Sequence, residues 1–333
     1  MSFSTAGKTE FIDNVERIIL EQAMNRKPNQ IRALFRQIPW SPTDGDKVTF
    51  NSIALSGIAS RVSENEEIPM VNPKKGNELS KTAQQYGDRL NTTKRMLKFQ
   101  NRHPELVRLA SQLVNRVDNV LDFEMTLQLF GEADQTTFTA TNGETVNIAT
   151  SDAKALFATD HSYGGVTFSN ILSGGGALSV ANLTALIGQM QLNTPDDFGT
   201  NISPEVDTII IADHIAMVKK CHELFGSALT PETANNAVNY YGGTGGFKVV
   251  ALKYGTHLPN FTTSTDNAYR WLAADSRMLQ ESLQYQICDG IEMDSHIVTD
   301  GKFETSTLVT QFASFAAVQP QGIGASLSAA APS

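Results

Sequence analysis

A chain of 333 residues has room for two or three packed layers, and its 41% hydrophobic content is ordinary for a globular protein. The formal net charge of −9 disfavours a protein whose main task is to coat nucleic acid. No apolar run approaches the roughly 18 residues that cross a bilayer, and the N-terminus lacks the apolar core of a secretion signal. We therefore expect a chain made in a cytoplasm, with Cys221 and Cys288 reduced.

The first 45 residues predict an arm. Residues 8–25 place apolar side chains, among them Phe11 and Ile18, at near-helical spacing, which indicates an amphipathic helix. A turn-rich passage follows, marked by Pro39, Pro42 and Asp44-Gly45. The apolar face of such an arm must be buried against a surface outside the arm itself.

Interrupted strands are indicated between residues 48 and 73. The stretch that follows carries a net positive charge, in contrast to the rest of the chain. Residues 74–102 hold eight cations against two anions, Glu78 and Asp88. Two interpretations stay open: a solvated face, or a cationic flap that docks on the acidic surface of another copy. The cations are Lys74, Lys75, Lys81, Arg89, Lys94, Arg95, Lys98 and Arg102.

A long helix is predicted over residues 104–130. Pro104 suits its first turn, Gly131 its end, and an apolar stripe runs between them. At 1.5 Å per residue the helix spans roughly 40 Å, so we interpret it as a spine. Asn142-Gly143, between alternating segments, then predicts a hairpin over residues 138–148.

The stretch 155–190 is predicted to be a connector. A loop carrying Gly164-Gly165 and a glycine cluster at 174–176 precede a helix capped by Ser179. A polar turn follows at residues 196–199.

Strands at 206–212, 247–252 and 269–273, with a helix capped by Asp213 and ending near Gly226, indicate a small α/β lobe over residues 204–275. A hairpin is expected around residues 297–309. The tail from Gly324 is expected to be frayed.

No convincing active site emerges from the residues. Gly7-Lys8-Thr9 lacks the earlier glycine of a phosphate-binding loop, and Asp160-His161 has no matching nucleophile motif. The gaps of seven and eight residues from His214 to Cys221 and His222 do not suit a single metal ion. We therefore expect no catalytic, cofactor-binding or metal-binding residue, and interpret His161 as fixing its loop through hydrogen bonds.

Several segments closely resemble the Mu-like major head subunit group of tailed bacteriophages. The resemblance is carried most specifically by residues 156–161 (LFATDH), 170–174 (NILSG) and the helix start at 177–179 (ALS). Weaker similarities follow in order along most of the chain from 48 to 310. They lie at residues 50–69, 86–97, 204–212, 271–275 (WLAAD), 290–292 and 300–303.

The resemblance implies the α+β capsid fold called Hong Kong 97-like. In that fold residues 1–45 are the N-terminal arm and residues 46–100 the extended β-hairpin loop. Residues 101–203 form the peripheral domain with its spine helix and β-sheet, residues 204–275 the α/β axial domain, and residues 276–333 return to the peripheral strands and the tail.

By this resemblance the protein is a structural major capsid protein, without enzyme activity or cofactor, in the virion and in the host cytoplasm during assembly. Its partners are other copies, as hexamers and pentamers of an icosahedral shell, with double-stranded DNA contacted only weakly. Because the arm is short, a separate scaffolding protein is expected, with a portal and a possible decoration protein. The candidate inter-subunit contacts are Lys74, Lys75, Arg89, Lys94, Arg95, Phe11 and Ile18.

Two alternatives stay open. One is an encapsulin-like nanocompartment shell, which has the same fold and needs a cargo pocket. The other is a cytosolic hydrolase that uses the loop of Asp160 and His161.

Overall fold

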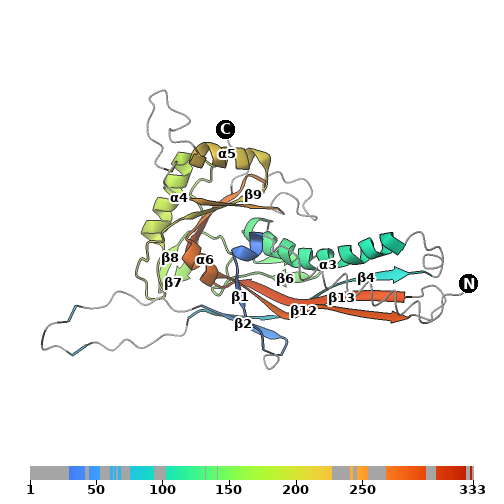
Figure 1. The fold of residues 1–333 in the computed structure, drawn as a ribbon. Helices are drawn as coiled ribbons and strands as arrows, with labels where there is room; N and C mark the ends of the chain where they lie inside the picture. Colours follow the sequence, from blue (N-terminus) through green and yellow to red (C-terminus); the bar gives the residue numbers. More distant parts are fainter. Residues whose placement is uncertain are drawn as a thin grey trace, which may run out of the picture.

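The structure is a computed structural model. It describes residues 30–41, 45–52, 61–62, 64, 67–68, 76–93, 103–131, 133–140, 142–226, 241–242, 246–253, 268–297, 305–327 and 331. Two four-stranded sheets organise this part of the chain, with strand orders β1-β12-β13-β4 and β10-β9-β11-β14 (Figure 1). Helices and strands are mixed along the sequence, so the predicted α+β class is confirmed. The predicted helix over residues 8–25 lies outside the described residues.

The first sheet is built on its two longest strands, β12 (Leu283–Ile297) and β13 (Thr305–Ala317), which pair antiparallel. β4 (Gln84–Thr92) pairs antiparallel with the other side of β13. The short β1 (Arg36–Ile38) pairs in parallel with the start of β12. The predicted hairpin around residues 297–309 is therefore confirmed, but it is the end of a much longer pair.

Helix α3 (His103–Thr126) covers one face of the first sheet and continues into a π-helical turn, η4 (Leu127–Gly131) (Figure 1). The predicted long helix is confirmed, and it ends at the predicted glycine. Apolar side chains at a spacing of three or four residues turn towards the sheet and are buried, which explains why the stripe forms a helix here. They are Leu113, Val114, Val117, Leu121 and Met125.

The end of this helix is closed by a residue distant in sequence. Arg270 Nη1 donates hydrogen bonds to the carbonyl oxygens of Phe130, at 2.6 Å, and Gly131, at 3.2 Å. The last carbonyl groups of a helix have no partner within the helix, so a guanidinium group satisfies them well.

The second sheet has buried central strands. β9 (Thr208–Ala212) and β11 (Trp271–Ala274) are buried at every position, and they pair antiparallel. β10 (Lys248–Leu252) pairs in parallel with β9, and β14 (Ile323–Ser326) pairs antiparallel with β11. The three strands predicted for the α/β lobe are confirmed to within two residues at each end.

β14 overturns two expectations about the C-terminus. Its residues, predicted as part of a frayed tail, are buried in the second sheet. Residues 276–333 therefore do not all return to the first sheet. Gly324 packs closely beneath α4, because an added Cβ would lie 2.7 Å from Met190 Sδ, so that methionine side chain would have to shift.

Three helices flank the two sheets. α4 (Val180–Asn193) begins as predicted, since the Ser179 hydroxyl accepts from Asn182 N at 3.2 Å. α5 (Ile215–Gly226) ends as predicted. α6 (Ser276–Ser282) was not predicted. Asp275 caps this helix, and the helix joins the second sheet to β12.

Asp213 is not the residue that caps α5. The helix begins at Ile215, and Ala216 N donates to His214 Nδ1 at 3.3 Å. The imidazole therefore takes the place of the expected carboxylate, one residue later along the chain.

Three hairpins complete the described fold. β2 (Lys47–Asn51) pairs with β3 (Glu78–Thr82), and β5 (Thr137–Thr139) with β6 (Thr145–Asn147), as Asn142-Gly143 predicted. The third hairpin joins β7 (His161–Tyr163) to β8 (Val166–Phe168).

The segment around Gly164 and Gly165 was expected to be a loop and is instead the turn of this third hairpin. Their φ angles are +56° and +81°, as a two-residue hairpin turn requires. A Cβ on Gly164 would lie 2.0 Å from Gly199 N, so the turn also packs closely against the next loop.

The N-terminal segment is anchored to α3 by one arginine. Arg32, in the short helix η1 (Gln30–Ala33), donates from Nε to Asp122 at 2.6 Å and from Nη2 to Asp118. The Asp122 side chain is fully buried. Burying carboxylates is costly unless a cation accompanies them, so Arg32 fixes where this segment meets the helix.

Replacing Arg32 by methionine is expected to lower the free energy of unfolding by about 3 kcal/mol, because two buried carboxylates lose this cation. Urea denaturation measures the change. The matched control is Arg116→Met, which removes the ion pair between the exposed Arg116 on α3 and Asp88 on β4 and is expected to cost no more than about 1 kcal/mol. Equal losses in the two variants would contradict the anchoring role.

Candidate functional site

Of the candidate inter-subunit contacts, one lies in the described part of the chain. Arg89 is exposed on β4, and its Nε donates to Ser306 Oγ on β13 at 2.5 Å. No described carboxylate forms an ion pair with it. The other candidates lie outside the described residues: Phe11, Ile18, Lys74, Lys75, Lys94 and Arg95.

The outer face of the first sheet, opposite α3, is covered over only part of its length. Near the start of β12 the β2–β3 hairpin covers it, and Val48 and Phe50 are buried there against Cys288, Ala316 and Val318. No described element covers this face further along the strands.

We call this uncovered part the distal face. In register, Arg89 on β4 stands opposite Leu308 on β13, which stands opposite Asp294 on β12. One step along, Gly87, Thr310 and Glu292 form the next row. The charged members are exposed, and Leu308 and Thr310 are partly exposed. The distal face thus carries a cation on one edge strand and carboxylates on the other.

His161 is fully buried and both of its ring nitrogens face acceptors. Nδ1 lies 2.7 Å from Asp152 Oδ2, and Nε2 lies 3.2 Å from the carbonyl oxygen of Leu156. Although burial raises the pKa of Asp152, hydrogen bonds from His161 and Thr150 outweigh it and hold that pKa below its ordinary value.

This arrangement confirms the interpretation of His161 as a residue that fixes its loop. Both ring nitrogens face groups inside the protein, so neither faces a nucleophile or a substrate. The neighbouring Asp160 points elsewhere and pairs with Lys154 at the surface. The geometry therefore gives the hydrolase alternative no general base at this position.

Two further results bear on chemistry. Among the residues that the structure describes, no three His, Cys, Asp or Glu side chains are grouped to hold a metal ion. Burial raises the pKa of the Cys221 thiol to about 12, so it stays protonated at neutral pH and is a poor nucleophile.

No helix within the described ranges is both long and apolar enough to span a bilayer.

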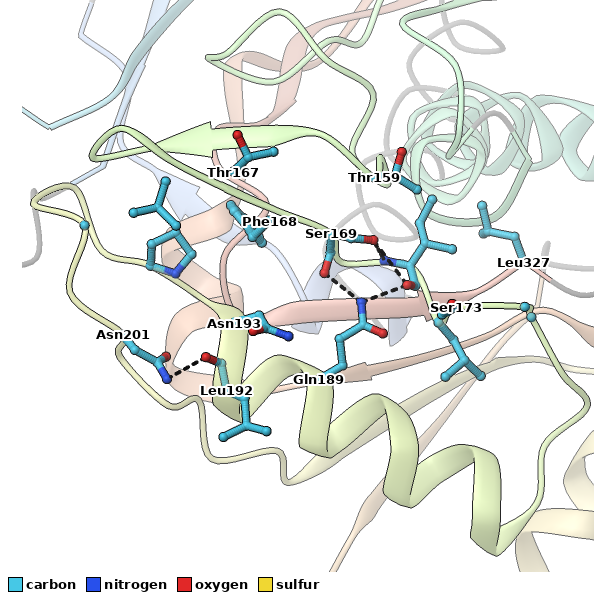
Figure 2. Close-up of a pocket in the computed structure, with 17 residues that line it drawn as sticks. Thr159, Thr167, Phe168, Ser169, Ser173, Gln189, Leu192, Asn193, Asn201 and Leu327 are labelled. Carbon is cyan, nitrogen blue, oxygen red and sulfur yellow. Dashed lines mark hydrogen bonds between the residues drawn. The ribbon is translucent and has the colours of Figure 1, made fainter.

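A cavity of about 1080 Å³ lies between α4, the β7–β8 hairpin and the loop at residues 171–175 (Figure 2). No charged side chain lines it. Figure 2 shows Gln189 reaching from α4 across to the facing segment, where Nε2 donates to the carbonyl oxygens of Ser169, at 2.8 Å, and Ile171, at 2.9 Å. Leu192 at the rim is 74% exposed. The cavity has the polarity of a packing surface and lacks an acid–base pair.

A second cavity, of about 640 Å³, contains titratable groups, of which only Lys81 was named from the sequence, as one of the eight cations in residues 74–102. Lys81 Nζ donates to the Asn147 carbonyl oxygen at 3.0 Å, and burial lowers its pKa to about 8. Tyr86 donates to Glu124 at 2.8 Å, which joins β4 to α3. Burial raises the pKa of Glu124, against the opposing effect of that hydrogen bond. Only the pairing of distant segments creates this site.

Comparisons with known proteins agree with the fold. No protein-family model matches the chain, and no curated protein matches it. A subunit in the mature capsid of bacteriophage PhiM1 matches with a TM-score of 0.51 and 11% identity, over 90% of this chain and 87% of that chain. This chain has a capsid-like fold. The capsid of an empty GTA particle matches with a TM-score of 0.50 and 9% identity, over 90% and 89% of the two chains. A virus-like particle from Pyrococcus furiosus matches with a TM-score of 0.42 and 10% identity, over 94% and 97%.

The Glu124 carboxyl is expected to make stability depend on pH. Its folded-state pKa lies above the ordinary 4.5. The protonated carboxyl therefore contributes its full share of stability below pH 4.5, and this share is lost as pH rises through the folded pKa. Glu124→Gln keeps an acceptor for Tyr86 and removes the buried charge. The variant is therefore expected to gain stability over the parent chain as pH rises from 4 towards 7, which denaturation at several pH values measures.

Glu144→Gln is the matched control, because that side chain lines the same cavity and belongs to an exposed residue. Two results would contradict a raised Glu124 pKa. One is a Glu124→Gln variant less stable than the parent chain at pH 7, and the other is a difference in stability between the two that is the same at every pH.

Proposed function

We propose that this chain is the major capsid protein of a tailed bacteriophage of the Mu-like group. It assembles as hexamers and pentamers into an icosahedral shell that encloses double-stranded DNA. The observation that carries the proposal is the fold shared with a PhiM1 capsid subunit over 90% of this chain. The sequence resemblance described above supports the narrower assignment to the Mu-like group.

In this proposal the described elements take the roles of a capsid subunit. α3 is the spine helix, the first sheet belongs to the peripheral domain, and the second sheet with α4 and α5 belongs to the axial domain. Residues 1–45 are the arm and residues 46–100 the extended loop. The partners are other copies of the chain, a separate scaffolding protein, a portal and a possible decoration protein.

The properties of the described surfaces support a structural role. The cavity of about 1080 Å³ is lined without charged groups, and the ring of His161 is occupied on both sides. The distal face leaves polar and apolar groups uncovered in a single copy. A net charge of −9 disfavours tight binding of the chain to packaged DNA.

Negative-stain microscopy of the purified, concentrated protein tests the proposal. Rings of five or six copies, or closed hollow particles, are the expected result. A protein that stays monomeric at every concentration and salt condition, with and without a co-expressed scaffolding protein, would overturn it.

The nucleic acid content of purified particles separates the capsid from the nanocompartment alternative. A phage head protein is expected to yield shells that hold duplex DNA when made during infection, while its isolated subunits bind duplex DNA weakly at physiological salt. Gel-shift titration at several salt concentrations measures that weak binding. Particles from infected cells that enclose a protein cargo and no DNA would favour the nanocompartment.

A further inference from the structure

We infer that the distal face is a contact between copies, in which the β4 edge of one copy lies beside the β12 edge of the next and Arg89 faces the neighbour's carboxylate at position 292. The inference rests on the proposed assembly and names where two copies meet. It starts from the two edges of the first sheet.

Both edges are open along the distal face. β12 pairs with β1 only at residues 284–286, so within the described residues no strand covers its outer edge from 289 to 297. Among the described strands β4 pairs with β13 alone, so no described strand covers its outer edge either. Long uncovered edges are a liability in a single molecule, and they are stable where a partner or charged side chains protect them.

The charges on the two edges are complementary. Arg89 on β4 and Glu292 on β12 lie on the same face of the sheet, as the strand register requires. Neither forms an ion pair with any described residue. When the β4 edge of one copy lies beside the β12 edge of another, this cation and this carboxylate become neighbours on adjacent strands.

Backbone pairing at the contact is confined to the regular parts of the two edge strands, and side chains add to it. Two register shifts between Ile287 and Glu292 make β12 irregular, and such bulges interrupt pairing with a further strand. Leu308 and Thr310, partly exposed between the two charges, supply surface that a second copy covers. An exposed ion pair contributes little by itself, so the contact gains its strength by repetition around a ring.

The contact is head-to-tail, because the two edges differ. Such contacts close into rings when the rotation between copies allows it. The distal face is only three strands wide, with neighbouring strands about 4.8 Å apart. The area that it can bury is therefore much smaller than the roughly 1,200 Å² of a stable interface, and isolated subunits are not expected to pair through it alone.

A disulfide cross-link tests the contact directly. Positions 89 and 292 in one copy are separated by β13, so their Cα atoms lie about 10 Å apart or more, beyond the roughly 7 Å limit of a disulfide. A disulfide between these positions must therefore join two copies. The variant Arg89→Cys with Glu292→Cys is assembled, oxidised and run on a denaturing gel without reductant.

The expected result is a ladder of covalent multimers from the double variant and only monomer from each single variant. The single variants also control for the native Cys221 and Cys288, which are buried. Particles that form normally while the double variant stays monomeric would overturn this contact and leave the proposed function intact. A ladder from either single variant would overturn the head-to-tail arrangement.

Charge reversal gives an independent readout. Arg89→Glu and Glu292→Arg are each expected to lower the yield of particles about tenfold, and the two together to restore it, because the pair is rebuilt with opposite polarity. Thermal melting of the unassembled variants separates a folding defect from an assembly defect, since Arg89 also bonds Ser306. Single variants that fold and assemble like the parent chain, or a double variant as defective as the singles, would refute the pairing. If the parent chain forms no particles at all, the proposed function itself fails.

Discussion

The fold depends on the antiparallel pairing of β12 with β13. β11 leads through α6 into β12, and β13 leads through a short loop into β14. Because Leu283 pairs with Ala317, both connections to the second sheet leave from the same end of this pair. α3 packs on one face of the pair, and a single helix cannot cover the other face. The β2–β3 hairpin covers the near part of that outer face, and no described element covers the remainder. The described part of a single copy therefore leaves part of this sheet face uncovered.

The interior shows how distant segments are held to that frame. Arg32 secures the N-terminal segment to α3, Arg270 closes the end of the same helix, and the Tyr86–Glu124 pair joins it to β4. Each of these contacts satisfies a buried polar group that would otherwise cost free energy. They give a rigid unit in the described part of the chain, and rigidity matters for a subunit whose edges must meet others in register.

Much of this fold could be predicted from sequence, and the failures have physical causes. α3, β9 and the Asn142-Gly143 hairpin were predicted because local periodicity or turn chemistry decides them. Most of β12 was missed because buried glutamines and two register shifts interrupt its alternating pattern. β14 was missed because its small residues lack a strand-like pattern, and only the fold shows them packed against Met190. Among the candidate contacts, Arg89 gained significance only when register placed it on one face with Glu292.

The central claim is that assembly completes the open edges of the first sheet. Hydrogen–deuterium exchange at the backbone amides of residues 84–92 and 289–297, compared between free subunits and assembled particles, tests it most directly. The account predicts that amides on the outer edges exchange quickly in free subunits and slowly in particles, while amides in β9 and β11 stay protected in both. Equal exchange of the edge amides in the two states would contradict it.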